Sequence, residues 1–115
     1  MKKVEDLDVF KLSHQLTLEI YKITEEFPSS EKFGLVSQMR KAATSIPTNL
    51  MEGAYRMSRK EFRHFISIAK GSCGEIRYQL LLAKDLQYLR EEKYTELESS
   101  YERISMMLTK LYKSL

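Results

Sequence analysis

The side chains best suited to metal chemistry are Glu61 and His64, which form a Glu-x-x-His pattern. Di-iron four-helix bundles carry this pattern on two helices and take one further glutamate from each of the other two. The second histidine, His14, has Lys11 where the pattern requires a carboxylate. Glu61 is also explained as the carboxylate of a capping box that begins at Ser58. The sequence therefore predicts no metal site and no other cofactor.

The strongest nucleophile is the single cysteine, Cys73. Nucleophilic catalysis needs a base beside the nucleophile, and two scattered histidines do not indicate one. The sequence has no glycine-rich phosphate loop. A lone cysteine cannot form an internal disulfide, which is typical of the reducing cytoplasm. We therefore expect a cytoplasmic protein that is not an enzyme.

A polar stripe and a proline distinguish the middle of the chain. The apolar spacing from Met39 to Gly53 is helical, yet Pro47 lies inside it. Such a proline removes one backbone hydrogen bond and clashes with the carbonyl of Ala43, at a cost of about 3 kcal/mol. The sequence therefore predicts a helix that is kinked at Pro47. At about 100° per residue, a polar stripe borders its apolar face; its members are Gln38, Ser45, Asn49, Glu52 and Arg56.

Two glycines, Gly71 and Gly74, interrupt a later helical pattern beside Ser72 and Glu75. Glycine in a helix interior costs about 1 kcal/mol relative to alanine and is typical of close backbone approach. We expect the kinked helix to be the neighbour, so that the polar groups form one hydrogen-bonded seam. Its members are Gln38, Ser45, Asn49, Glu52, Ser72 and Glu75. This seam is interpreted as a packing device, with a catalytic carboxylate pair and an interface or ligand role as alternatives.

Four helical segments must position these residues. The first runs from about Asp8 to Phe27, and the second from about Glu31 through Pro47 to near Ala54. The third follows the capping box for about thirty residues, and a break near residues 90–92 precedes the fourth, whose apolar residues repeat at spacings of three and four. Strand patterns are absent from the sequence. It therefore predicts an all-α, antiparallel up-down four-helix bundle that forms one domain over residues 1–115.

Two helices carry a second apolar stripe that a bundle core does not require. On the first helix the stripe contains Phe10, His14, Thr17 and Tyr21, and on the third it contains Ile68, Leu82, Leu86 and Leu89. A bundle helix needs one apolar face. We therefore expect the protein to form a homo-oligomer, with a broad monomeric core as the alternative.

The positive charge is concentrated in the middle of the chain. The formal net charge is +3, whereas residues 28–89 contain ten Lys or Arg and five Asp or Glu. Contact with nucleic-acid phosphates is one interpretation, and a solvated helix face is the other. Because the N-terminus is acidic, we expect that the protein is not secreted. Because no long apolar run is present, we expect no membrane span. The candidate phosphate contacts are Arg40, Lys41, Arg56, Arg59, Lys60 and Arg63.

A set of short motifs resembles a known bacterial family. The set contains Phe27-Pro28, Phe33-Gly34-Leu35, the runs over 38–43, 45–49 and 52–53, and Ile68-Ala69-Lys70-Gly71-Ser72 with Glu75. Together these resemble the four-helix-bundle proteins encoded in intervening sequences of 23S rRNA genes. They are also similar to the accessory variability proteins of diversity-generating retroelements. The resemblance extends from about Leu7 to Leu111.

The resemblance implies a homo-oligomer, typically a pentamer, with no enzymatic chemistry. It further implies a basic surface that binds RNA or DNA, and a reverse transcriptase as a partner of the retroelement relatives. Because no recognition helix stands out, we expect contacts to the nucleic-acid backbone or shape. The alternative function is an oligomeric adaptor that binds an acidic protein partner without touching nucleic acid.

Overall fold

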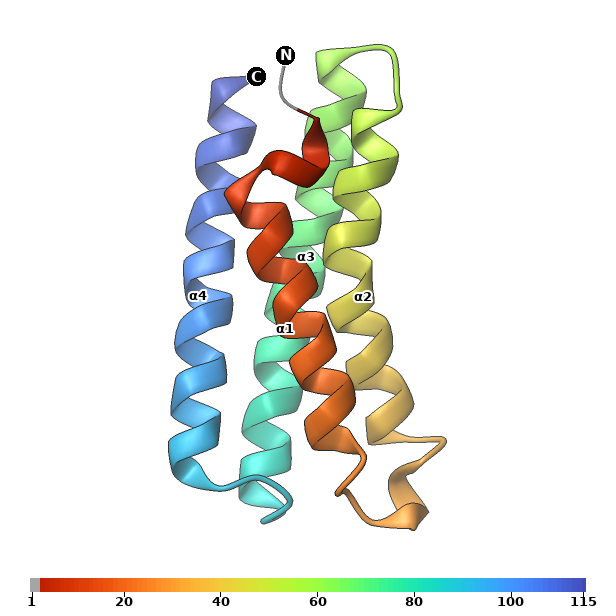
Figure 1. The fold of residues 1–115 in the computed structure, drawn as a ribbon, viewed down its shortest axis with the longest axis vertical. Helices are drawn as coiled ribbons and strands as arrows, with labels where there is room; N and C mark the ends of the chain where they lie inside the picture. Colours follow the sequence, from red (N-terminus) through yellow and green to blue (C-terminus); the bar gives the residue numbers. More distant parts are fainter. Residues whose placement is uncertain (1–2) are drawn as a thin grey trace.

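The computed structural model describes residues 3–115, which form four long antiparallel α-helices and no strand (Figure 1). The predicted all-α four-helix bundle is therefore confirmed. Two short 3-10 turns, Val4–Asp6 and Ser29–Glu31, precede the first and second helices. The helices are α1, Asp8–Thr24; α2, Leu35–Ala54; α3, Arg59–Asp85; and α4, Glu91–Ser114.

Helix boundaries differ from the prediction at two places. α1 ends at Thr24, yet Phe27 is still buried and its ring packs 5.4 Å from that of Tyr88. The predicted start of the second helix at Glu31 is wrong, because Gly34 has φ −111° and ψ −108° and separates the 3-10 turn from α2. An apolar side chain can thus belong to the core without belonging to the helix.

Helices that follow each other in the sequence contact each other, and α1 also contacts α4. The four helices therefore form a square in which α1 and α3 lie diagonally opposite. The bundle measures 43 × 25 × 20 Å. The 3-10 turn Val4–Asp6, the end of α4 and the turn between α2 and α3 lie at one end (Figure 1). One continuous core runs along the bundle, and large side chains from every helix, such as Ile20, Met39, Ile76 and Tyr101, are completely buried within it.

Pro47 lies inside an uninterrupted α2, so the predicted kink is not confirmed. Because proline has no N–H, the carbonyl of Ala43 cannot accept the usual intrahelical bond. The hydroxyl of Thr17 on α1 lies 3.2 Å from that carbonyl and also 2.7 Å from the carbonyl of Ser13. Thr17 thus shares its hydrogen between its own helix and the acceptor that Pro47 leaves open. This contact ties α1 to α2 at the proline.

Gly53, not the glycine pair of α3, is where two helices approach closely. A methyl group added at Gly53 would lie 2.8 Å from the Phe65 side chain and 2.9 Å from that of Phe62. Added methyl groups at Gly71 and Gly74 would meet nothing within 4 Å. The expectation that these two glycines pack against α2 is therefore wrong. They form an open strip on the outer face of α3.

The second apolar stripes are only partly exposed. On α3, Ile68 is 39% and Leu86 44% exposed, whereas Leu89 is buried and belongs to the core. On α1, Thr17 is buried in the contact just described, while His14 and Tyr21 lie at the surface. Each helix thus keeps some exposed apolar surface, which is narrower than its sequence pattern suggests.

The Thr17 contact predicts a specific coupling with Pro47. Thr17→Val, which keeps the shape and removes the hydroxyl, should lower the free energy of unfolding by about 1–3 kcal/mol. The same substitution in a Pro47→Ala background should cost clearly less, because the restored N–H of residue 47 can reach the Ala43 carbonyl. Thr17→Ser is the control that keeps the hydroxyl. Chemical denaturation of the four variants in a double-mutant cycle measures the coupling, and purely additive effects would contradict it.

Candidate nucleic-acid interface

The six predicted basic residues do not form one patch. Arg40 and Lys41 lie in the first half of α2, whereas the other four lie at the end where α2 turns into α3. Thirteen residues of helix separate Lys41 from Ala54, which corresponds to about 20 Å. The structure therefore divides the predicted set into a lateral pair and a terminal group of Arg56, Arg59, Lys60 and Arg63.

Arg40 is held by the fold. Its Nε donates to the Thr24 hydroxyl over 3.0 Å, and one terminal nitrogen donates to the Tyr21 carbonyl over 3.2 Å. Its guanidinium also lies 4.6 Å from the centre of the Tyr21 ring. These contacts join α2 to the last turn of α1. Arg40 thus uses two of its five N–H donors to join α1 to α2.

Two arginines of the terminal group are oriented by neighbours. The Arg56 guanidinium lies 4.8 Å from the centre of the Phe65 ring and 3.4 Å from a carboxylate oxygen of Glu52. Both members of that ion pair are about half exposed. Arg63 donates to the backbone carbonyl of Leu115 over 2.9 Å, which ties α3 to the end of α4. Both guanidinium groups are therefore positioned at the surface before any ligand arrives.

Of the six predicted basic residues, three have no partner among residues 3–115. Arg59 and Lys60 occupy the first turn of α3 and are exposed, and Lys41 is exposed on α2. The Ser58 hydroxyl accepts the N–H of Glu61 over 3.1 Å, so Ser58 caps this helix. Among residues 3–115, the reciprocal bond from the Ser58 N–H to the Glu61 carboxylate that a capping box requires is absent. Helix N-termini carry a partial positive charge. Arg59 and Lys60 therefore add two full charges to a helix end that already favours anions.

Three of the six predicted members of the polar seam form hydrogen bonds with one another. The hydroxyls of Ser45 and Ser72 lie 2.7 Å apart between α2 and α3. The amide nitrogen of Asn49 donates over 2.8 Å to the hydroxyl of Ser45 and over 2.8 Å to its carbonyl. The other three predicted members, Gln38, Glu52 and Glu75, lie at the surface. The seam is thus a small contact between two helices that contains no buried carboxylate.

The Glu-x-x-His pattern lies at the surface of α3. The His64 ring packs edge-on against Phe65, with 5.4 Å between ring centres. Within residues 3–115, no three His, Cys, Asp or Glu side chains gather as metal ligands would. None of the helices in the same part of the chain combines the length and apolar character needed to span a bilayer.

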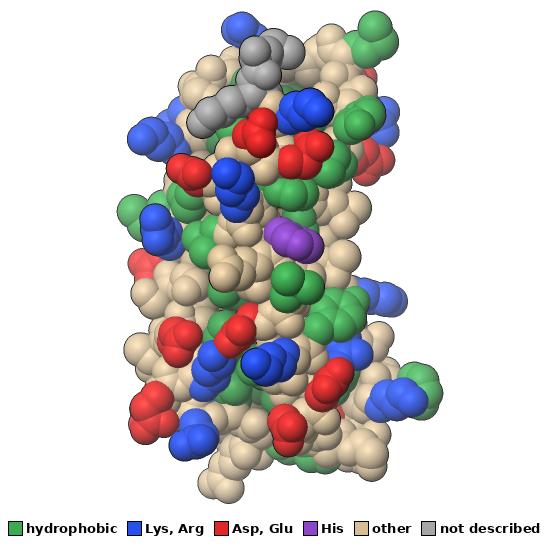
Figure 2. Space-filling model, in the orientation of Figure 1, with side chains coloured by type: hydrophobic (Ala, Val, Ile, Leu, Met, Phe, Trp, Pro, Cys, Tyr) green, Lys and Arg blue, Asp and Glu red, His purple; other side chains and the backbone are tan. Residues whose placement is uncertain are grey.

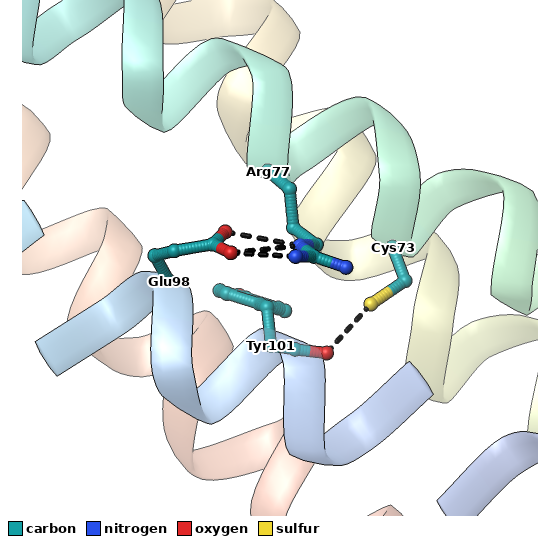
Figure 3. Close-up of polar contacts among 4 residues, drawn as sticks. All are labelled: Cys73, Arg77, Glu98 and Tyr101. Carbon is teal, nitrogen blue, oxygen red and sulfur yellow. Dashed lines mark hydrogen bonds and ion pairs between the residues drawn. The ribbon is translucent and has the colours of Figure 1, made fainter. Parts of the chain in front are cut away.

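Sequence reasoning missed the polar contacts between α3 and α4 (Figure 3). Arg77 binds Glu98 through two nitrogens, with the shortest distance 2.6 Å. The thiol of Cys73 donates to the carbonyl of Tyr101 over 3.0 Å. The phenol oxygen of Tyr101 is buried without a partner in the described part of the chain. Because the paired residues are 21 to 28 positions apart, no local spacing in the sequence could have indicated them.

Burial makes Cys73 a weak nucleophile. The side chain is completely buried, and burial raises the pKa of its thiol to about 11, although the charge of Arg77 opposes the shift. At pH 8 only about one thiol in a thousand would be ionised, and the thiolate is the reactive form. Cys73 is therefore a core residue.

A comparison with a family model agrees with this architecture. The model described as 23S rRNA-intervening sequence protein matches residues 5–110. The chain belongs to this family. No curated protein matches the chain. The fold is also that of a solved Bacteroides thetaiotaomicron protein of unknown function from the S23 ribosomal protein family. The two chains share 24% identity over 91% of this chain and 95% of the other, with a TM-score of 0.84.

The environment of Cys73 predicts slow alkylation. At pH 8 the folded protein should react with iodoacetamide at least 100-fold more slowly than the protein in denaturant, because the thiol is both buried and protonated. The control is Ser99→Cys in a Cys73→Ala background, since Ser99 is exposed on α4. Mass spectrometry of timed samples measures both rates. Equal rates for Cys73 and the surface cysteine would contradict the assignment of Cys73 to the core.

Proposed function

We propose that this member of the 23S rRNA-intervening sequence protein family is a non-enzymatic, oligomeric protein that binds the backbone of RNA or DNA. The contact surface is the end of the bundle where α2 turns into α3. The observation that carries the proposal is the pair Arg59 and Lys60, exposed on the first turn of α3 with no partner in residues 3–115. Cations that the fold does not use are available to displace counterions from phosphates.

The neighbours of this pair support the same role. Arg56 and Arg63 are already oriented at the surface by Phe65 and by the Leu115 carbonyl. Less side-chain freedom is then lost on binding, because a guanidinium held in place is pre-organised. The ring of Tyr55 is 81% exposed beside Arg56. An exposed aromatic ring next to cations can stack on an unpaired base, and such stacking tolerates any sequence.

Self-association would strengthen a weak surface. We propose that the chain forms a homo-oligomer, with the pentamer that the family resemblance implies as the expected stoichiometry. A ring repeats the terminal group once per chain, so that several weak sites act on one polynucleotide. Lys41 lies about 20 Å from the terminal group and is not part of it. The terminal group is therefore the primary site.

A second candidate function is supported by apolar surface at the same place. The Met57 side chain is 99% exposed and lies between Arg56 and the first turn of α3. Exposed apolar groups beside cations also suit an acidic protein, such as a reverse transcriptase, and protein interfaces favour Met, Tyr and Arg. In that role the chain is an oligomeric adaptor that does not touch nucleic acid.

The proposed contact predicts salt-dependent binding that charge reversal abolishes. Arg59→Glu/Lys60→Glu should weaken binding to a labelled single-stranded RNA or DNA at least tenfold in low salt. Wild-type affinity should fall by about 0.7–0.9 log units per log unit of salt for each phosphate neutralised. Sequence preference should be slight, because phosphate contacts carry no sequence information. Fluorescence anisotropy at several salt concentrations measures all three.

The matched control is Arg103→Glu/Lys110→Glu on the exposed face of α4, which changes the net charge equally. This variant should bind almost as tightly as wild type. Equal losses in both variants would mean that net charge alone drives binding, and the assigned surface would be wrong. No binding by wild type at low salt would favour the protein-adaptor function.

A further inference from the structure

A largely apolar groove runs along the outer surface of the bundle between α1 and α2. It has a volume of about 880 Å³. Its walls include Phe10, His14 and Tyr21 of α1, Thr44, Pro47 and Thr48 of α2, and Tyr55 just after the end of α2. Figure 2 shows this face, where hydrophobic side chains lie exposed among charged ones over both helices. An exposed apolar surface of this kind typically marks an interaction site.

The outer face of α3 has the complementary shape. Gly71 and Gly74 leave a strip without side chains, and it is bordered by Ile68, Tyr78 and Leu81, which are 39%, 62% and 37% exposed. Two glycines in a helix interior cost about 1 kcal/mol each, and no contact among residues 3–115 offsets that cost at these positions. A helix with such a strip can enter a groove more deeply than one covered with side chains.

The groove and the strip lie at the same height in the bundle. The Ser45–Ser72 hydrogen bond places the middle of α2 level with the middle of α3. The contact of Thr17 with Ala43 places the middle of α1 at that height as well. Gly71 and Gly74 are therefore level with the part of the groove near Pro47. Two bundles placed side by side with their long axes parallel would bring the strip of one against the groove of the other.

Charges at this height are also complementary. Lys41 lies one turn before Ser45 on α2, in an adjoining hollow that shares Tyr21, Thr44 and Thr48 with the groove. Glu75 lies nearly one turn after Ser72 on α3. Because α2 and α3 are antiparallel, these two residues are at the same level within about one residue. Both are exposed, and neither has an ion-pair partner in the described part of the chain.

We propose that the α1–α2 groove of one copy receives the outer face of α3 from a second copy, with Lys41 facing Glu75. The interface joins two different surfaces, so each copy has one groove and one α3 face to offer. α3 is diagonal to α1 in the bundle, so both surfaces can be occupied at once. Such head-to-tail contacts close into a ring when the rotation between copies allows it. The inference rests on the self-association proposed above and is independent of nucleic-acid binding.

The first test uses one variant for each surface. Thr48→Arg introduces a large charged side chain into the groove, and Gly71→Gln/Gly74→Gln covers the α3 strip. Both sites are exposed, and circular dichroism verifies that the variants are folded. Light scattering coupled to gel filtration in high salt should give an oligomer for wild type and one chain for each variant alone. An equal mixture of the two variants should give a dimer. In it, the intact groove of the Gly71→Gln/Gly74→Gln variant binds the intact α3 face of the Thr48→Arg variant.

Other outcomes of this mixture overturn the proposal. If the groove variant alone still dimerises, the interface joins two identical surfaces, such as α3 with α3. If the mixture stays monomeric although both variants are folded, the two surfaces do not bind each other. A monomeric wild type at micromolar concentration also contradicts the proposal. None of these results depends on whether nucleic acid binds at the α2–α3 end.

The second test exchanges the proposed charge pair. Lys41→Glu and Glu75→Lys should each shift the assembly toward monomer, because like charges then face each other across the interface. The double variant Lys41→Glu/Glu75→Lys should recover the wild-type mass. Failure of the double variant to recover, with both single variants dissociated, would show that the two residues do not face each other. Unchanged masses for all three variants would also overturn the pairing.

Discussion

The architecture depends on how α2 accommodates a proline in its middle. Pro47 cannot donate to Ala43, and Thr17 on the neighbouring helix supplies a hydroxyl to that carbonyl. An unpaired buried carbonyl would cost about 1–3 kcal/mol, so α1 is held at this height along α2. The same pairing sets the walls of the groove on the outer surface. A local defect of one helix thereby fixes the position of the next and shapes a surface of the bundle.

The other helix pairs are joined by polar contacts at the edges of an apolar core. Ser45 and Ser72 join α2 to α3, Arg77 and Glu98 join α3 to α4, and Lys93 pairs with Glu19 between α4 and α1. The hydrogen bonds that Arg77 donates to the Glu98 carboxylate raise the pKa of the Arg77 guanidinium. These pairs are partly exposed, so each contributes little to stability. They link neighbouring helices at defined heights, as Ser45 and Ser72 do for α2 and α3.

Helical periodicity predicted the four elements well, because a buried helix face repeats every three to four residues and leaves a clear pattern. The prediction failed where the outcome depended on another helix. The predicted kink at Pro47 left out the α1 hydroxyl that donates to the Ala43 carbonyl. Gly71 and Gly74 gave no indication of whether their open side faced α2 or solvent. The six basic residues looked like one group in the sequence. Sequence spacing does not show which cations, such as Arg40, already form contacts within the fold. The bond between Arg77 and Glu98 left no local signal at all.

The proposed function requires an assembly of several chains that carries nucleic acid on its surface. Native mass spectrometry of the protein purified from cells, before and after nuclease treatment, tests it in one measurement. The untreated sample should contain a species with the mass of several chains plus bound polynucleotide, and the nuclease-treated sample the same number of chains without the added mass. A single chain without bound nucleic acid in both samples would contradict it.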